Sequence, residues 1–432
     1  MRPTWRARPV PSNAVIDLRR LRDDPGYRQG AVNKGASSDA IDELLQLDSS
    51  RREIQLVVEE LRARSNAASK EIGKADPAER EAKIAAAGEI KTELQAKEAE
   101  LAEAADKADA AAITIPNPAT DTSPVGGEDD FVVIETVGDT NAAPPMDHAE
   151  YGEFMGWVES EKAAQNMGSR FAYLKGEAVL LEFALVQWTM AKLVARGFTP
   201  VVTPVLVREE MMEDAGFFPT DRHQVYELAE DDLFLIGTSE VALAGLHRGE
   251  RLDATDLPLR YAGFSSCFRR EAGTYGKDTR GIFRVHQFDK VEMFSWCDPN
   301  TSWDELEFLR GIEQEIIADL GFPYRVIDVA TGDLGAAAAK KYDCEVWLPS
   351  EGQYRELTST SNYTDYSARR LKTRAKGEDG TDLVHTLNGT ACAIGRTLVF
   401  MMEHCQQADG SFVVPEVLRP FCGLDVIAPP SS

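Results

Sequence analysis

The chain contains 432 residues, of which 43% are hydrophobic and 28% are charged. The length suggests about two to four domains. The composition is typical of a folded protein and excludes wholesale disorder. Forty-seven basic against 72 acidic residues leave a formal net charge of −25. A global basic field therefore cannot attract nucleic acid, and any RNA binding must depend on local basic patches.

The sequence shows no pattern typical of a membrane protein or of a metal-binding protein. It lacks a run of about 18 uninterrupted apolar residues, the length needed to cross a bilayer, so we expect no membrane partner. The six cysteines are scattered, without a CxxC pair or a histidine pair at ligand spacing. That pattern favours reduced thiols in the cytoplasm over a disulfide framework or a zinc site.

The first segment, residues 1–14, carries Arg2, Arg6 and Arg8 and no acidic side chain. It lacks the apolar run of a secretory signal. We expect a disordered extension here. An arginine-rich organellar transit peptide is the alternative, and the role of the segment stays open.

Residues 39–112 contain no aromatic side chain and place apolar residues at alternating spacings of three and four. The apolar positions of this pattern are Leu44, Leu47, Ile54, Val58, Leu61, Ala68, Ile72, Ala87, Ile90, Leu94, Leu101, Ala104 and Ala108. Heptads on both sides of a turn with Pro77 predict an antiparallel coiled-coil hairpin, with the proline in the first turn of its second helix. We assign residues 15–115 to this arm domain, although a structural spacer or a dimerisation rod would show the same heptads.

A connector rich in Pro, Gly and Asp follows at residues 116–145, and a second domain should occupy residues 146–432. In that domain we expect helices at residues 174–196, 303–320 and 395–407. Strands are expected at residues 198–207, 233–236, 264–268, 283–288, 291–296 and 324–329. This order predicts an antiparallel sheet flanked by helices, an α+β fold.

Common nucleotide and hydrolase motifs are missing from the sequence: it has no GxxxxGK[ST] loop, GxGxxG after a strand, GxSxG, HExxH or kinase signature. Residues 267–292 are instead dense in arginine, glycine and aromatic side chains. Two strands around a loop would bring Arg269, Arg284 and Phe288 into one cleft, where arginines suit phosphates and an aromatic face suits a purine. A buried Glu292 there could hold an ammonium group. We favour a nucleotide site over a solvated basic hairpin.

The strings FRREAG at 268–273 and RGIFRVHQFDKVE at 280–292 resemble motif 2 of class II aminoacyl-tRNA synthetases, specifically of the seryl-tRNA synthetases. Other segments are similar to further marks of that family, in family order. They are residues 15–18 with the hairpin (the tRNA-binding arm), 197–204 (motif 1), 237–240 (the TxE serine loop), 355–362 (the E-x-S-S-x-SN segment) and 388–397 (motif 3). The likeness runs from about residue 15 to residue 423.

The resemblance implies that ATP and L-serine form seryl-adenylate and that serine is then esterified to tRNA(Ser), with tRNA(Sec) as a second substrate only where the organism has one. It implies a class II catalytic domain, ATP as substrate, Mg²⁺ as cofactor and no zinc. The implied partners are tRNA(Ser) with its long variable arm and a second copy of the chain, joined through motif 1, in the cytoplasm.

The resemblance also implies roles for single residues. Arg269 would stabilise the α-phosphate, Glu271 would read the adenine amino group, and Phe288 and Arg396 would enclose the adenine. Arg269 and Arg396 would be the catalytic residues. The residues implied for ATP are Arg269, Arg270, Glu271, Arg284, Val285, Phe288, Glu356, Leu357, Thr358, Ser359 and Arg396, with Mg²⁺ on Glu356 and Ser359. The residues implied for serine are Thr238, Ser239, Glu240, Glu292 and Thr390.

Two rival hypotheses remain open. A paralogue that loads an amino acid onto a carrier protein usually lacks the arm, which this chain retains. A coiled-coil interaction protein with an inactive synthetase domain would be expected to lose Arg269, Glu356 or Arg396, and all three are present. Serine-dependent ATP–pyrophosphate exchange distinguishes an active enzyme from an interaction protein with an inactive domain. Charging of tRNA(Ser) distinguishes a synthetase from a carrier-loading paralogue.

Overall fold

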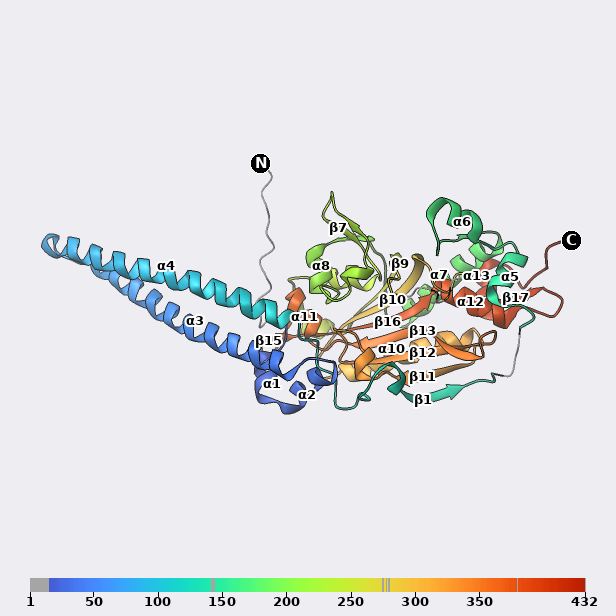
Figure 1. Ribbon diagram of the computed structural model, residues 1–432, viewed down its shortest axis with the longest axis horizontal. Helices are drawn as coiled ribbons and strands as arrows, with labels where there is room; N and C mark the ends of the chain where they lie inside the picture. The colour runs from blue at the N-terminus through green and yellow to red at the C-terminus, as the bar shows by residue number, and fades with distance from the viewer. Residues whose placement is uncertain are drawn as a thin grey trace. The chain divides into compact units, whose positions relative to one another are not determined.

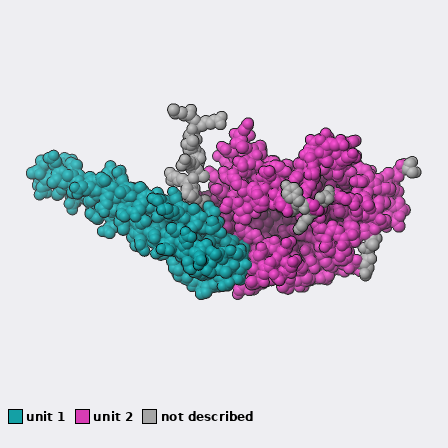
Figure 2. All heavy atoms as spheres, viewed as in Figure 1, with its two compact units in different colours: residues 1–118 teal, residues 119–432 magenta. Residues whose placement is uncertain are grey.

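A computed structural model describes residues 15–140, 144–273, 276, 278, 280–378 and 380–431. The extension predicted at residues 1–14 lies outside the described residues. The chain divides into two compact units, residues 1–118 and 119–432, coloured teal and magenta in Figure 2. The predicted domain limits and the separate linker at 116–145 stay predictions, and that linker contains a strand, β1 (Val132–Val137).

Unit 1 consists of helices. Two short ones precede two long ones that run antiparallel to each other (Figure 1). They are α1 (Leu18–Asp23), α2 (Pro25–Asn33), α3 (Ser38–Ile72) and α4 (Pro77–Ile113). All thirteen apolar positions of the predicted heptads are buried or partly buried, and Pro77 opens α4 as expected. The predicted coiled-coil hairpin is therefore confirmed.

The base of the hairpin has a small core, where Ile16 and Leu21 pack with Ile41, Leu44 and Ala112. Towards the tip the burial thins, because two helices alone can bury only one seam each. An ion pair between Arg62 and Glu98, 2.8 Å long, crosses from one long helix to the other.

Unit 2 is built on an eight-stranded sheet of order β1-β11-β12-β13-β16-β10-β9-β4. All neighbouring pairs are antiparallel except β4 with β9, which is parallel. The strands after β1 are β4 (Thr199–Val202), β9 (Leu259–Phe268), β10 (Gln287–Cys297), β11 (Tyr324–Asp328), β12 (Lys340–Leu348), β13 (Gln353–Asn362) and β16 (His385–Ala393). The predicted α+β class is confirmed.

Three long helices pack against this sheet and complete the core (Figure 1): α7 (Glu177–Ala195), α10 (Ser302–Asp319) and α12 (Ile394–Cys405). All three were predicted to within a few residues. Smaller helices are α5 (His148–Phe154), α6 (Ser160–Met167), α8 (Glu209–Asp214), α9 (Glu240–Ala244), α11 (Tyr366–Leu371) and α13 (Arg419–Cys422). Short 3₁₀ helices occupy Glu128–Asp130, Arg222–Gln224, Gly245–His247, Ala254–Asp256, Thr331–Asp333 and Glu416–Leu418.

The remaining strands form small sheets outside the main one. They are β2 (Val158–Glu159), β3 (Tyr173–Leu174), β5 (Leu206–Arg208), β6 (Glu227–Leu228), β7 (Leu233–Leu235), β8 (Arg251–Asp253), β14 (Arg374–Gly377), β15 (Gly380–Leu383), β17 (Phe412–Val413) and β18 (Val426–Ile427). The strand predicted at 198–207 is thus divided into β4 and β5 around Pro204, since proline interrupts a strand ladder.

Helix α7 bears on the expectation that the chain has no membrane partner. Within the described residues it is long and apolar enough to cross a membrane by length and composition alone, with a mean hydropathy of 1.5. Glu182 and Lys192 interrupt the apolar run, which is why a search for uninterrupted residues missed it. Leu181, Leu185 and Leu193 belong to the core of unit 2, a placement typical of a core helix.

Candidate active site

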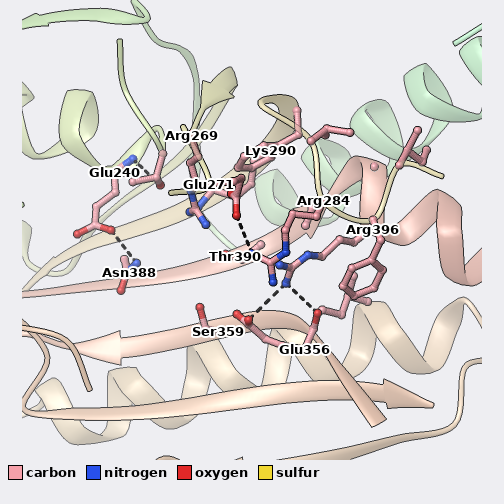
Figure 3. Close-up of a pocket in the computed structure, with 18 of the residues that line it drawn as sticks. Glu240, Arg269, Glu271, Arg284, Lys290, Glu356, Ser359, Asn388, Thr390 and Arg396 are labelled. Carbon is pink, nitrogen blue, oxygen red and sulfur yellow. Dashed lines mark hydrogen bonds and ion pairs between the residues drawn. The ribbon is translucent and has the colours of Figure 1, made fainter. Parts of the chain in front are cut away.

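A cavity of about 190 Å³ opens where β9, β10, β13 and β16 lie side by side (Figure 3). Twelve residues singled out from the sequence line it: Thr238, Glu240, Arg269, Glu271, Arg284, Val285, Phe288, Glu356, Leu357, Ser359, Thr390 and Arg396. These residues are up to 158 positions apart in the sequence, and the fold brings them together around one cavity. The remaining four, Ser239, Arg270, Glu292 and Thr358, do not line the cavity.

These four side chains instead contact other residues or are fully buried, which is why they do not line the cavity. Arg270 follows the end of β9, and its guanidinium carbon lies 5.8 Å from the ring centre of Tyr226. Ser239 Oγ is 2.7 Å from Ser265 Oγ. The Thr358 hydroxyl donates to the buried Glu313 Oε2 at 2.9 Å, while Glu292 is fully buried.

One end of the cavity carries Arg396 and Glu356, and Arg269 lies between this end and Glu240 (Figure 3). Arg269 Nε donates to the Gly237 carbonyl at 3.1 Å, and its guanidinium carbon lies 5.2 Å from the ring centre of Phe288. Arg396 Nη1 donates to Glu356, at 2.9 Å to the carbonyl and 3.3 Å to Oε2. The Glu356 side chain is 47% exposed. Its partial loss of hydration acts to raise its pKa, but nearby positive charges, Arg396 first, bring the pKa below the usual value. This end suits phosphates and a cation.

A chain of ion pairs closes the side of the cavity next to it. Arg284 pairs with Glu271 at 2.6 Å and with Asp278 at 3.2 Å. Arg355 also pairs with Asp278, at 2.9 Å. Burial would raise the pKa of Asp278, yet hydrogen bonds and charges from Arg355 and Arg284 bring it below its usual value. Glu271 has a φ of 49°, a left-handed conformation that is uncommon for a residue with a side chain.

The other end is lined by Glu240, with Glu292 behind it, and these two residues are 3% and 0% exposed. The Asn388 side-chain amide donates to both, at 2.9 and 3.2 Å, and Thr238 Oγ1 donates to Glu292 Oε2 at 3.4 Å. Burial, followed by the charge of Glu292, raises the pKa of Glu240 to about 8. Such a site suits a small molecule with an ammonium and a hydroxyl group.

Sequence reasoning missed three polar residues of the wall: Lys290, Tyr363 and Asn388. Strand alternation in the sequence could have identified two of them. Lys290 stands two residues after Phe288 in β10, and Asn388 stands two residues before Thr390 in β16, so strand alternation places each on the same face as a predicted residue. For Tyr363, which follows β13, we find no such signal.

Comparisons with known proteins show the family to which the chain belongs. The family model described as "Seryl-tRNA synthetase N-terminal domain" matches residues 15–119, and "tRNA synthetase class II core domain (G, H, P, S and T)" matches residues 223–405. A serine–tRNA ligase of Acidothermus cellulolyticus is 50% identical over 422 residues, which cover 96% of this chain and all of that relative. The chain belongs to the seryl-tRNA synthetase family. A serine–tRNA ligase of Rhodococcus jostii is 48% identical over 96% of this chain and its own whole length.

Two solved structures are similar over almost the whole chain. The seryl-tRNA synthetase of Pyrococcus horikoshii, complexed with ATP, has a TM-score of 0.89 and 37% identity and covers 96% of this chain and 100% of its own. The cytoplasmic serine–tRNA ligase of Naegleria fowleri, in complex with AMP, has a TM-score of 0.86 and 30% identity over 96% and 99%. The family and the ligase class predicted from the sequence are therefore confirmed.

Proposed function

We propose that the cavity binds ATP and L-serine side by side, and that the chain activates serine as seryl-adenylate and then transfers it to tRNA(Ser). One observation carries this function: a single cavity joins an arginine-rich end, suited to phosphates, with an end lined by the buried Glu240 and backed by the buried Glu292, suited to a small amino acid. Arg396 lines the first end, Glu240 lines the second, and Arg269 lies between them (Figure 3).

The reaction needs positioning and charge stabilisation more than a reactive side chain. A serine carboxylate oxygen attacks the α-phosphorus, and the bond to the β-phosphate oxygen breaks to release pyrophosphate. Arg269 would stabilise the charge that develops on the α-phosphate. The terminal adenosine hydroxyl of the tRNA then attacks the activated carbonyl, and AMP leaves. Since the reactants are held together, no protein nucleophile is required.

We assign the adenine to the gap between Phe288 and Arg396, with the Glu271 carboxylate accepting from the adenine amino group. An aromatic ring and a planar guanidinium suit the two faces of a purine. Arg284 pairs with Glu271, so the adenine would have to compete with this ion pair for the Glu271 carboxylate. We assign Arg396 to the γ-phosphate as well.

Mg²⁺ fits the arginine-rich end on chemical grounds. Glu356 offers an ionised carboxylate and Ser359 a hydroxyl, both hard oxygen ligands, and both line the cavity. Within the part of the chain that the structure describes, no cluster of three or more His, Cys, Asp or Glu side chains could hold a metal. The phosphates of ATP would therefore complete the shell, and the ion would neutralise their charge when bound.

We assign serine to the end formed by Thr238, Glu240 and Thr390, with Glu292 behind it. Glu240 would pair with the ammonium group, and Thr390 would contact the hydroxyl. A site that hydrogen-bonds a substrate hydroxyl leaves buried polar groups unpaired when alanine binds, which supplies selectivity of about 10⁴ or more.

A homodimer through motif 1 is supported by exposed apolar side chains. Helix α7 exposes Leu180, Phe183 and Val194 by 47, 56 and 49%, and Val202 of β4 is 79% exposed. Apolar side chains gathered on one helix and its adjacent strand are typical of a surface that another chain covers. We propose a second copy of this chain as the occupant.

We propose that the α3–α4 hairpin binds the long variable arm of tRNA(Ser). Five of its basic residues make no ion pair among the described residues: Arg64, Lys70, Lys74, Arg80 and Lys91. Free cations along one stretch suit an RNA backbone, which proteins recognise by shape and phosphates. Such a function belongs in the cytoplasm, and tRNA(Sec) would be a second substrate where the organism has one.

Two assays test the proposal. Serine-dependent ATP–pyrophosphate exchange should be present, should require Mg²⁺ and should be weak with alanine, and tRNA(Ser) should be charged with serine. Absence of exchange with every amino acid would favour an interaction protein with an inactive domain. Exchange without tRNA charging, together with loading of a carrier protein, would favour the paralogue.

A further inference from the structure

Lys290 is a buried lysine in the wall of the cavity to which neither the sequence nor the proposed reaction gives a role. Its side chain is 7% exposed and forms an ion pair with Glu292, whose side chain is completely buried. Both residues project from β10 and are two residues apart, so they share one face of the sheet. Lys290 lines the cavity (Figure 3), and Glu292 does not. The lysine therefore meets the cavity, and the carboxylate lies behind it.

The hydrogen bonds around Glu292 require an acceptor. Asn388 Nδ2 donates to Oε1 at 3.2 Å, and Thr238 Oγ1 donates to Oε2 at 3.4 Å, the oxygen that Lys290 also contacts. An ionised carboxylate only accepts, whereas a protonated one must donate from one oxygen. Three donors around one side chain thus match the ionised form.

Burial opposes that ionised form. A carboxylate without a countercharge in a protein interior takes up a proton. Within the described residues, Lys290 makes the one ion pair to Glu292. Removing this lysine should therefore convert Glu292 to the neutral acid.

We propose that Lys290 is a positioning residue for serine recognition: it keeps Glu292 ionised and fixed, so that the network of Glu292, Thr238 and Asn388 presents the geometry that serine needs. The inference rests on the proposed function and deepens it. It makes selection of serine depend on a residue that need not touch serine. A lysine with a merely structural role would affect folding without a separate effect on serine.

Lys340 offers a matched control for that structural role. It lies in β12 of the same sheet, its side chain is 9% exposed, and it pairs with Asp328 at 2.7 Å. It is not part of the cavity wall. K340M and K290M therefore each remove one buried lysine from one buried ion pair, and they differ in their distance from the serine end.

The test measures serine and ATP kinetics by pyrophosphate exchange for wild type, K290M, E292Q, K290M/E292Q and K340M. Since glutamine imitates the neutral acid, K290M, E292Q and the double variant should share one serine KM, at least tenfold above wild type. The KM for ATP should stay within twofold in all of them. K340M should keep the wild-type KM for serine, whatever it does to the melting temperature.

Several results would overturn the proposal. They are an unchanged or lowered serine KM in K290M, equal rises in the KM for serine and for ATP, and a double variant whose serine KM exceeds that of E292Q by a further tenfold. If K290M alone does not fold, the serine KM of the double variant, compared with that of E292Q, tests the proposal. The double variant removes both charges and leaves no unpaired ion. Wild type that shows no serine-dependent exchange would refute the proposed function itself, a result distinct from these.

Discussion

Replacing residues 63–96, the outer part of the α3–α4 hairpin, with a short Gly/Asn turn should separate tRNA binding from serine activation. The cut leaves the small core at the base intact, because Ile41, Leu44 and Ala112 lie outside it. It also keeps the ion pair of Arg62 with Glu98, which crosses the two helices just inside the cut. We therefore expect a folded protein with wild-type ATP–pyrophosphate exchange and a large loss of tRNA charging.

The size of that loss follows from the cations removed. The deleted segment carries all five basic residues of the hairpin tip that make no ion pair: Arg64, Lys70, Lys74, Arg80 and Lys91. Each phosphate contact contributes about 0.9 to the slope of log affinity against log salt. Five contacts amount to a slope of about 4 to 5, and at physiological salt their loss should raise the KM for tRNA by about 10²-fold or more.

A variant with these five residues changed to glutamine should show the same loss without any change in backbone. Its control is R62Q/K83Q, which removes two cations that already pair with Glu98 and Glu79 and should weaken tRNA binding much less. The measurements are charging kinetics and the salt dependence of tRNA binding. Full charging by the shortened protein, or an unchanged salt slope in the five-residue variant, would refute the RNA role and favour a spacer.

Three further predictions concern the cavity. R269A should lower kcat for adenylate formation by about 10²-fold or more, because it removes charge stabilisation from the transition state; an effect on the KM for ATP alone would reduce Arg269 to a binding residue. T390V should raise the serine KM by about five- to thirtyfold, as expected for one lost hydroxyl contact worth about 1–2 kcal/mol, and an unchanged serine KM would remove Thr390 from the site. Glu240, with its pKa raised to about 8 by burial and by Glu292, must lose a proton to pair with the serine ammonium, so the serine KM should fall as pH rises from about 6.5 to 8. E240Q should abolish that trend, and a KM that rises over this range would contradict the assignment.

The hairpin could be predicted from the sequence because local pattern and tertiary packing agree there. Every apolar heptad position is buried or partly buried, and Pro77 begins α4 where its missing N–H has no cost. The motif residues of the cavity could be named for a different reason: their order and spacing resemble a family. Neither composition nor periodicity would have placed Arg269 and Arg396 in one cavity.

Strands β12, β13 and β16 escaped prediction, because their sequences lack a clear apolar alternation. Strand β13 carries Glu356, Thr358 and Ser359, and β16 carries Asn388 and Thr390. Polar side chains occupy these strands because they form the cavity or bind the carboxyl groups behind it. A functional site thus removes the hydrophobic signal by which its own strands would be recognised.

Residues 283–286 show the opposite error. Their apolar and aromatic side chains suggested a strand from 283 to 288, whereas β10 begins at Gln287. Phe283 instead lies against two cations, with the guanidinium carbon of Arg355 at 4.3 Å and that of Arg396 at 5.0 Å from its ring centre. The Phe283 ring packs against these two arginines. The apolar run at residues 283–286 therefore reflects this local contact and not the hydrogen-bonded ladder of a strand.

The acidic charge of the chain and its proposed RNA partner are compatible because charge acts locally. Residues 62–91 hold seven basic and five acidic residues, a small positive excess in a chain with a net charge of −25. At physiological salt a charge is screened over about 8 Å, whereas the 35 residues of α3 extend about 50 Å at 1.5 Å per residue. A phosphate near the tip therefore experiences the cations beside it and little of the acidic residues at the hairpin's base. Long helices thus let an acidic protein present a basic surface, and moving the five free cations to the base of the hairpin should abolish tRNA binding although the net charge would not change.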